Sequence, residues 1–173
     1  TLFPYTTLFR SSGDSMQSAI EQAADAHGPA RILMQIAGIG SAKRVVGKDG
    51  SAAPLEDFIK VVNVNLIGTW NTCRAAIPHL ADRGGSLVNI SSAAGIKGSP
   101  LHTPYTASKA GVVGMSRALA NELAAMNIRV NTVHPTHVST GMIMNEGTWK
   151  LFRPDLENPG PDDMAPICQM FRS

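Results

Sequence analysis

Apolar residues along this chain alternate between helical spacing and short continuous runs. The helical spacing predicts helices over residues 15–27, 55–81 and 105–126. The short runs predict strands over residues 31–38, 86–91 and 128–134, and the first of them is apolar enough to be buried on both faces. Because strands and helices alternate, the pattern predicts an α/β fold with a parallel sheet and crossover helices.

Two further features refine this pattern. In the long helix, the apolar stripe at steps of three and four residues consists of Phe58, Val62, Leu66, Trp70 and Cys73, which we expect to face the core. The glycine-rich stretch 38–54 is expected to be a loop. Residues 139–164 are expected to be a mobile segment that carries a short amphipathic helix over 142–152.

Composition narrows the class of protein. The chain has 173 residues, of which 43% are hydrophobic and 16% charged, as expected for one globular α/β domain. A net charge of +2 favours no nucleic-acid partner, and no apolar run approaches the ~20 residues that span a membrane. Cys73 and Cys168 lack metal-ligand spacing and are expected to be reduced. These features favour a cytoplasmic protein.

The candidate chemistry lies around Tyr105 and Lys109. They are four residues apart on a predicted helix, so their side chains share one face, and Ser92 lies thirteen residues before Tyr105 at a strand end. A nearby ammonium lowers the pKa of a phenol, so we expect Tyr105 to act as a general acid and base. Ser92 would hydrogen-bond the same substrate oxygen. The arrangement favours redox chemistry between alcohols and carbonyls.

The order of several motifs strengthens this interpretation. "VNVNLIGTW", "SLVNISSAAG", "PYTASKAGVVG" and "NIRVNTVHPT" follow one another at close spacing and together resemble the short-chain dehydrogenase/reductase family. The resemblance implies an incomplete Rossmann-like, doubly wound parallel sheet and an NAD(P)-dependent oxidoreductase. It places Asn65, Ser92, Tyr105 and Lys109 at the four catalytic positions. Asn65 would hold a proton-relay water near Lys109, and Lys109 would also bind the nicotinamide ribose.

The resemblance also implies cofactor contacts at the end of the first predicted strand. "MQIAG" stands where the family has Asn-Asn-Ala-Gly, so Ala37 and Gly38 match whereas Gln35 and Ile36 replace two asparagines that brace the sheet. Small residues here let the backbone approach the adenosine ribose. The cofactor would be NAD or NADP, with NAD favoured.

A second set of implied cofactor contacts follows the last predicted strand. "HPTHVSTGMI" takes the place of the family's Pro-Gly segment. Pro135 fixes the backbone there, Thr140 matches the position that meets the nicotinamide carboxamide, and the backbone of Val138 would lie beside it. Thr136 and Gly141 depart from the family pattern and bear on the loop geometry.

Several alternatives remain open at this point. Ser91 is the fallback for Ser92, and Asn65 could instead bond backbone groups in a structural role. A hydrolase is disfavoured because "ISSAAG" is not a nucleophile elbow and no acid is paired with His102, His134 or His137. A non-catalytic nucleotide-sensing or scaffold relative of the same fold is the alternative function. Such relatives lose Tyr or Lys, and this chain keeps both.

The ends of the chain carry separate expectations. Residues 1–11, "TLFPYTTLFRS", read like a translated sequencing adapter, so residues 12–173 are expected to be the partial domain. No Gly-rich turn opening a helix precedes Arg31, and the glycines that follow lack a helix behind them. Relative to the family, the first βαβ units and the last strand would be missing. We expect this chain by itself to give no turnover.

The resemblance divides between two branches of the family. Residues 31–66 resemble 3-hydroxyacyl-CoA dehydrogenases of type 2, whereas the C-terminal half resembles the carveol-dehydrogenase-like, mycofactocin-associated branch. A chain joined from two related genes would explain this. The apolar segment from Met142 to Phe152 implies a hydrophobic alcohol or ketone as substrate. The full-length parent would be a homotetramer built on the helices 55–81 and 105–126.

Overall fold

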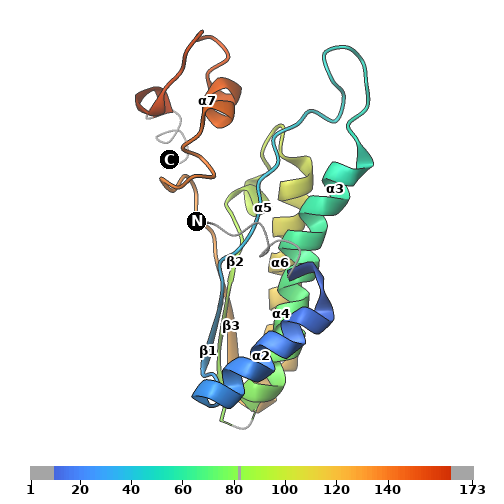
Figure 1. Cartoon of the computed structure of the whole chain (residues 1–173), viewed down its shortest axis with the longest axis vertical. Helices are drawn as coiled ribbons and strands as arrows, with labels where there is room; N and C mark the ends of the chain where they lie inside the picture. The colour runs from blue at the N-terminus through green and yellow to red at the C-terminus, as the bar shows by residue number, and fades with distance from the viewer. Residues whose placement is uncertain (1–9, 82, 165–173) are drawn as a thin grey trace.

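The computed structural model describes residues 10–81 and 83–164, arranged as helices against one parallel sheet (Figure 1). In chain order the elements are α2 (Gly13–His27), β1 (Ile32–Gln35), α3 (Leu55–Val62), the π-helix η1 (Asn63–Ile67), α4 (Gly68–Ala81), β2 (Gly85–Ile90), α5 (Ala94–Lys97), α6 (Thr103–Glu122), the 3-10 helix η2 (Ala124–Met126), β3 (Ile128–Val133), α7 (Glu146–Phe152) and the 3-10 helix η3 (Pro161–Met164).

The sheet has the strand order β1-β2-β3, and both pairs are parallel. Leu87 in the central strand pairs with Leu33 on one side and with Val130 on the other. The continuous helix formed by α3, η1 and α4 connects β1 to β2, and α6 connects β2 to β3. This arrangement confirms the predicted α/β fold with a parallel sheet and crossover helices.

The helices α4 and α6 cover one face of the sheet, and α2 packs on α4 (Figure 1). The core between them is apolar and consists of Cys73, Leu80, Leu87, Leu119, Leu123 and Ile128. On the opposite face Ile32 and Met34 are 64% and 57% exposed. The prediction that the first strand is buried on both faces is therefore wrong, because the described residues place helices on one face alone.

The predicted long helix over 55–81 is confirmed as a continuous run, but its apolar stripe is only partly right. Cys73 is buried as expected, whereas Phe58 and Trp70 are exposed and Thr69, outside the stripe, is buried. The π-helix η1 inserts one extra residue into the helical turn and shifts the positions that follow, which places Thr69 instead of Trp70 toward the core. Phe58 lies before η1, so the π-helix does not account for its exposure.

The remaining elements lie close to their predicted positions. The helix α2 begins after Ser12, whose side chain accepts a hydrogen bond from Ser15 N, and ends at Gly28 with a φ of 78°. The predicted helix over 142–152 is shorter, because Asn145 caps α7 by accepting from Thr148 N at 2.9 Å. None of the helices within the described residues is long and apolar enough to cross a membrane.

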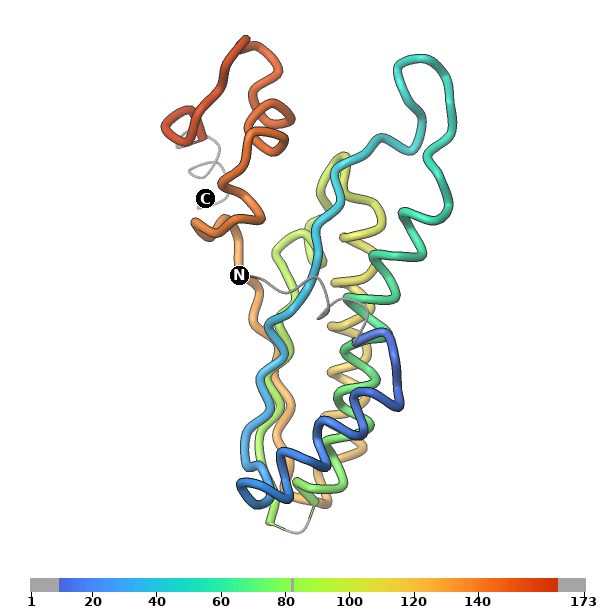
Figure 2. Tube along the Cα trace, viewed as in Figure 1, coloured from blue at the N-terminus to red at the C-terminus, as the bar shows by residue number. Residues whose placement is uncertain are grey.

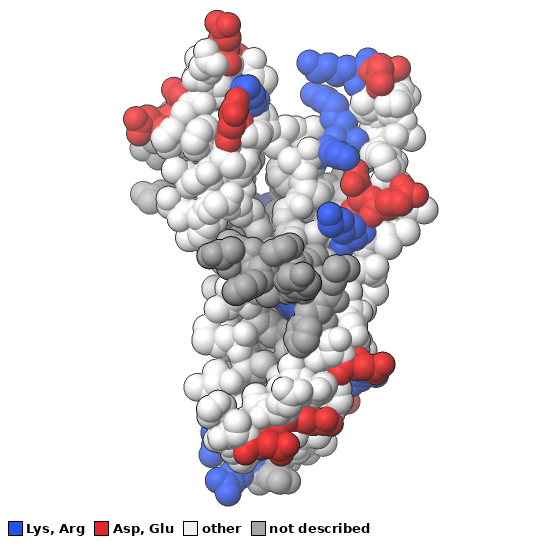
Figure 3. Space-filling view, viewed as in Figure 1, with Lys and Arg blue, Asp and Glu red and all other residues white. Residues whose placement is uncertain are grey.

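The carboxyl ends of the strands lead into two lobes that flank a notch (Figures 2 and 3). One lobe carries α7, and the other is the 38–54 loop, in which Val46 and Ala52 form an isolated antiparallel bridge. Leu101 O accepts a hydrogen bond from Lys43 N at 2.8 Å and so ties this loop to the start of α6. The fold therefore opens at the sheet edge where the predicted site residues lie.

Candidate active site

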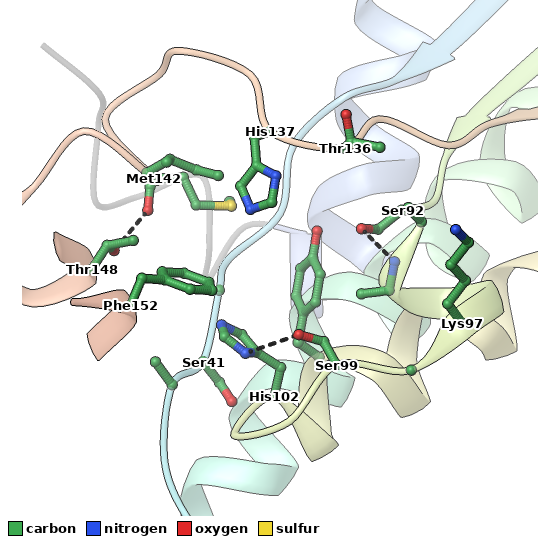
Figure 4. A pocket seen from close by; sticks show the side chains of 17 residues that line it. Ser41, Ser92, Lys97, Ser99, His102, Thr136, His137, Met142, Thr148 and Phe152 are labelled. Carbon is green, nitrogen blue, oxygen red and sulfur yellow. Dashed lines mark hydrogen bonds between the residues drawn. The ribbon is translucent and has the colours of Figure 1, made fainter. Parts of the chain in front are cut away.

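A cavity of about 430 Å³ lies beyond the ends of β2 and β3. Ser92 lies two residues after the end of β2, Thr136 and His137 follow β3, and α7 contributes Phe152 to the opposite wall (Figure 4). Tyr105 also lines it, from the first turn of α6. The carboxyl edge of a parallel sheet is the usual place for ligands in α/β folds. The cavity is therefore the candidate active site.

The structure separates the two neighbouring serines. Ser91 is 2% exposed, and its hydroxyl donates to the Lys109 backbone carbonyl at 2.9 Å, which holds the end of β2 against α6. Ser92 lines the cavity, and its Oγ accepts from Ala94 N at 3.2 Å. Tyr105 lines the same cavity, and the Ser92 hydroxyl acts to lower the pKa of its phenol. The geometry therefore favours Ser92 and gives Ser91 a packing role.

The Tyr105 phenol has a raised pKa in this structure. Burial raises the pKa above its ordinary value, and the hydrogen bond with Ser92 acts in the opposite direction. The Lys109 Nζ lies 5.8 Å from the centre of the Tyr105 ring. The expectation that Lys109 lowers this pKa toward neutrality is therefore wrong for the structure as it stands, because desolvation outweighs the favourable interactions.

The Lys109 side chain is buried, with 5% of its surface exposed. Its Nζ donates to Ile90 O at 2.7 Å, at the end of β2. Burial lowers its pKa to about 8, and the Arg10 guanidinium contributes to the same shift. The predicted one-turn spacing from Tyr105 is confirmed, and it places a buried amine over the Tyr105 ring, 5.8 Å from the ring centre.

Asn65 lies in the middle of the π-helix and is 1% exposed. Its Nδ2 donates to Ile39 O at 2.9 Å and to Ser108 Oγ at 3.1 Å, and its Oδ1 accepts from Ile39 N at 2.9 Å. Both amide hydrogens are thus used within the protein. The structural interpretation of Asn65 is the one that these contacts support, since its side chain holds the chain after β1 against α6.

The predicted cofactor contacts after β1 lie next to these groups. A Cβ on Gly38 would come within 3.1 Å of Asn65 Oδ1 and 3.5 Å of Lys109 Nζ. The absence of a side chain therefore leaves bare backbone beside a buried amine. Gln35 stands where the family has an asparagine, and its side chain is hydrogen-bonded. Its Nε2 donates to Thr69 O at 3.1 Å. The strand end is ordered despite this departure from the family pattern.

The predicted cofactor contacts after β3 are Pro135, Val138 and Thr140. The Pro135 carbonyl accepts from Ala93 N at 3.0 Å, which joins this segment to the residue after Ser92. Val138 is 53% exposed, and Thr140 accepts from Ile143 N and Met144 N at the turn before α7. Neither Val138 nor Thr140 lines the cavity, whereas Thr136 and His137 do. The cofactor roles of Pro135, Val138 and Thr140 stay predictions.

Sequence analysis placed Phe152 in an apolar segment near the substrate but missed its contacts with two histidines. The Phe152 ring stacks on His102 with centroids 6.2 Å apart and meets the edge of His137 at 5.9 Å. Burial lowers the pKa of His137. His102 precedes Tyr105 by three residues and so lies at the same end of the helix. This proximity to Tyr105 was the signal in the sequence that His102 could lie at the cavity.

Arg10 is a second residue that sequence reasoning set aside, within the segment 1–11. Its guanidinium is buried and donates to Ala37 O, to Gln35 Oε1 at 3.1 Å and to Thr69 Oγ1 at 2.9 Å. Gly68 leaves room for it, because a Cβ there would come within 3.0 Å of Arg10 Cβ. The origin of residues 1–11 stays a prediction. In this structure Arg10 braces the strand end that carries Ala37.

Comparison with known proteins agrees with the geometry. The family model described as short chain dehydrogenase matches residues 3–151. A (-)-trans-carveol dehydrogenase of Rhodococcus erythropolis is 42% identical over 152 residues, which are 87% of this chain and 53% of that protein. A short-chain type dehydrogenase/reductase of Mycolicibacterium smegmatis is 46% identical over 91% of this chain and 56% of its own length.

A solved structure extends the likeness to the fold. The carveol dehydrogenase of Mycobacterium avium in complex with NAD superposes with a TM-score of 0.87 at 43% identity. The match covers 93% of this chain and 57% of that one. The chain thus spans a little over half the length of the relatives that it matches.

Proposed function

Because the chain belongs to the short-chain dehydrogenase family, we propose that its cavity performs the chemistry of an NAD-linked oxidoreductase on secondary alcohols and ketones. The observation that carries this proposal is that Ser92 and Tyr105 line the same cavity, with the Lys109 Nζ 5.8 Å from the centre of the Tyr105 ring. Two hydroxyl groups that converge on one point can hold and protonate a single substrate oxygen.

Tyr105 is the proposed general acid and base. With a raised pKa the phenol carries its proton at neutral pH, which is the form that donates to a ketone oxygen during reduction. In the oxidising direction the phenol would first have to release its own proton to solvent, and the resulting phenolate would then accept the proton of the alcohol. Ser92 would donate a hydrogen bond to the same substrate oxygen and stabilise the charge that develops on it.

Lys109 and Asn65 have supporting roles in this proposal. The buried Lys109 amine lies between the phenol and the Ile90 carbonyl, where it can supply positive charge or a hydrogen bond to a ligand. Asn65 fixes the backbone at Ile39 and so shapes the passage beside Lys109. A water held by Asn65 would have to use its backbone or the second lone pair of Oδ1, because its amide hydrogens are bonded.

The residues fit the nicotinamide half of NAD. The bare backbone at Gly38 beside the Lys109 amine suits a sugar with several hydroxyls, and the structural relative from Mycobacterium avium is in complex with NAD. We propose that Gly38 and Lys109 hold the ribose and that Pro135, Val138 and Thr140 border the nicotinamide. Bound NAD supplies the hydride acceptor, and the chain's own residues orient the alcohol and move its proton.

The substrate is proposed to be a small, mainly hydrophobic alcohol or ketone. Met142, Ile143 and Phe152 provide apolar walls opposite Ser92. A relative from Rhodococcus erythropolis bears the name carveol dehydrogenase, which is consistent with an apolar substrate. The full-length parent is proposed to be a homotetramer. Exposed apolar residues at Ile59, Ile67 and Trp70 on the long helix support a subunit contact there.

A hybrid protein tests this function. Residues 12–164 would replace the matched part of the Mycobacterium avium carveol dehydrogenase, which supplies the rest of the domain. We expect the hybrid to reduce NAD with a panel of secondary alcohols, and the 173-residue chain alone to give no turnover. A hybrid that binds NAD, measured by fluorescence titration, but oxidises none of the alcohols would refute the proposal.

A further inference from the structure

His102 stands at the start of α6 on a backbone that is held in an uncommon conformation. Leu101 has a φ of 66°, in the left-handed region that non-glycine residues seldom adopt. The turn is fixed by hydrogen bonds from His102 N to Ser99 O at 3.2 Å and from Lys43 N to Leu101 O at 2.8 Å. Such strain persists where surrounding contacts determine it, and it is enriched at functional sites.

One nitrogen of the His102 ring is committed to the protein. Its Nδ1 lies 2.8 Å from Pro100 O and 3.4 Å from Ser99 Oγ. A carbonyl oxygen only accepts, so Nδ1 carries the proton. In the neutral ring Nε2 is then a hydrogen-bond acceptor. Within residues 10–81 and 83–164, no group hydrogen-bonds Nε2, and Figure 4 shows the His102 ring on the cavity wall beside Phe152.

The ring is also positioned relative to the reacting groups. It stacks on Phe152 with 22° between the planes and meets the Tyr105 ring edge-on, with centroids 6.4 Å apart. A substrate whose oxygen lies at Tyr105 therefore has an apolar surface at Phe152. The same cavity wall also carries His102 Nε2, an acceptor that no group within the described residues hydrogen-bonds.

We propose that His102 is a specificity-determining residue, whose Nε2 accepts a hydrogen bond from a second hydroxyl of the substrate. The substrate class is then a secondary alcohol that bears another hydroxyl close to the reacting carbon, on an apolar body that packs on Phe152. This inference rests on the proposed function for the identity of the reacting oxygen. A site built around an acceptor disfavours analogues that lack the donor.

Ligand binding to the chain itself tests this without hydride transfer. The probes are cis-cyclohexanediol and cyclohexanol, which differ by one hydroxyl, and affinities come from nuclear magnetic resonance titration. We expect the diol to bind about fivefold more tightly, the effect of one net hydrogen bond. His102→Phe keeps an aromatic ring but removes the acceptor, so the two affinities should become equal. His27→Phe, on an exposed histidine at the end of α2, is the matched control.

Two conservative variants distinguish recognition from packing. The amide oxygen of His102→Gln can reach the position of Nε2 and should retain a preference for the diol. His102→Asn reaches only the position of Nδ1 and should lose it. Equal affinities for both probes in the unaltered chain, or an unchanged preference in His102→Phe, would overturn the inference. An inactive hybrid with an intact diol preference would instead refute the proposed function alone.

Discussion

The two ends of the helix-covered sheet face use burial in different ways. At the amino ends of the strands the core is apolar, with Leu80, Leu87 and Leu123 nearly free of solvent. At the carboxyl ends the buried groups are polar, namely Asn65, Ser91, Ser108 and Lys109. The first end gains stability from apolar burial, whereas the second keeps polar groups buried through hydrogen bonds and so holds reactive side chains in place.

Removing the phenol hydroxyl should have the largest effect and should affect only the polar end. In the hybrid enzyme, we expect Tyr105→Phe to lower kcat by about a thousandfold, as loss of a general acid does. Thermal unfolding should show a Tm close to that of the unaltered hybrid, because the ring is kept. Steady-state NADH formation measures the rate, and retention of more than a tenth of it would contradict the assignment.

Truncating a side chain at the apolar end should have the next largest effect. Leu87 is 0% exposed in the central strand, and Leu87→Ala should lower the free energy of unfolding by about 2–5 kcal/mol. Ile32→Ala, on the uncovered face of the sheet, is the control and should change it by less than ~1 kcal/mol. Urea unfolding followed by circular dichroism measures both. Equal changes in the free energy of unfolding for the two variants would contradict the assignment of Leu87 to the core and of Ile32 to the exposed face.

Two glycines test how tightly the helices are packed at different places along α6. A Cβ on Gly95 would lie 2.9 Å from the backbone carbon of Lys109, so Gly95→Ala should push α5 away from α6 and cost about 1–3 kcal/mol. Gly114, further along α6, has nothing within 4 Å, and Gly114→Ala should stabilise by up to ~1 kcal/mol through helix propensity. The same urea titrations measure both, and two changes of the same sign would contradict this packing.

The buried amine should produce the smallest effect, a dependence of stability on pH. Lys109 has a folded pKa of about 8, below its ordinary value of 10.5, so above pH 8 the unfolded chain binds more protons and stability rises with pH. We expect a gain of about 1 kcal/mol between pH 8 and 9. Cys73, whose folded pKa of about 11 lies above its ordinary value of 9.0, opposes this gain, weakly near pH 8 and more strongly toward and above pH 9.

The Lys109→Met variant is the control for this pH effect. It keeps a long side chain in the same space but has no proton to bind, so its urea midpoint should not rise between pH 8 and 9. A rise of the same size in Lys109→Met would assign the effect to another group. The comparison also measures how strongly the polar end is desolvated without requiring turnover.

The sequence alone determined the order of strands and helices and the proximity of Tyr105 to Lys109. Both follow from local periodicity: apolar runs are read as buried strands, and a four-residue spacing places Tyr105 and Lys109 on one helical face. The choice between Ser91 and Ser92 depended on which hydroxyl faces the cavity, and only the tertiary structure decided it.

Tertiary structure also decided the features that depend on contacts between distant segments. The π-helix interrupted the α-helical spacing of the long helix, so Thr69 is buried where the stripe predicted Trp70, and desolvation raised the pKa of Tyr105 where the spacing predicted a lowered one. His102, His137 and Phe152 lie up to fifty residues apart in the chain and meet only in the fold. Burial and long-range contact are properties of the packed chain, and for that reason local spacing could not reveal them.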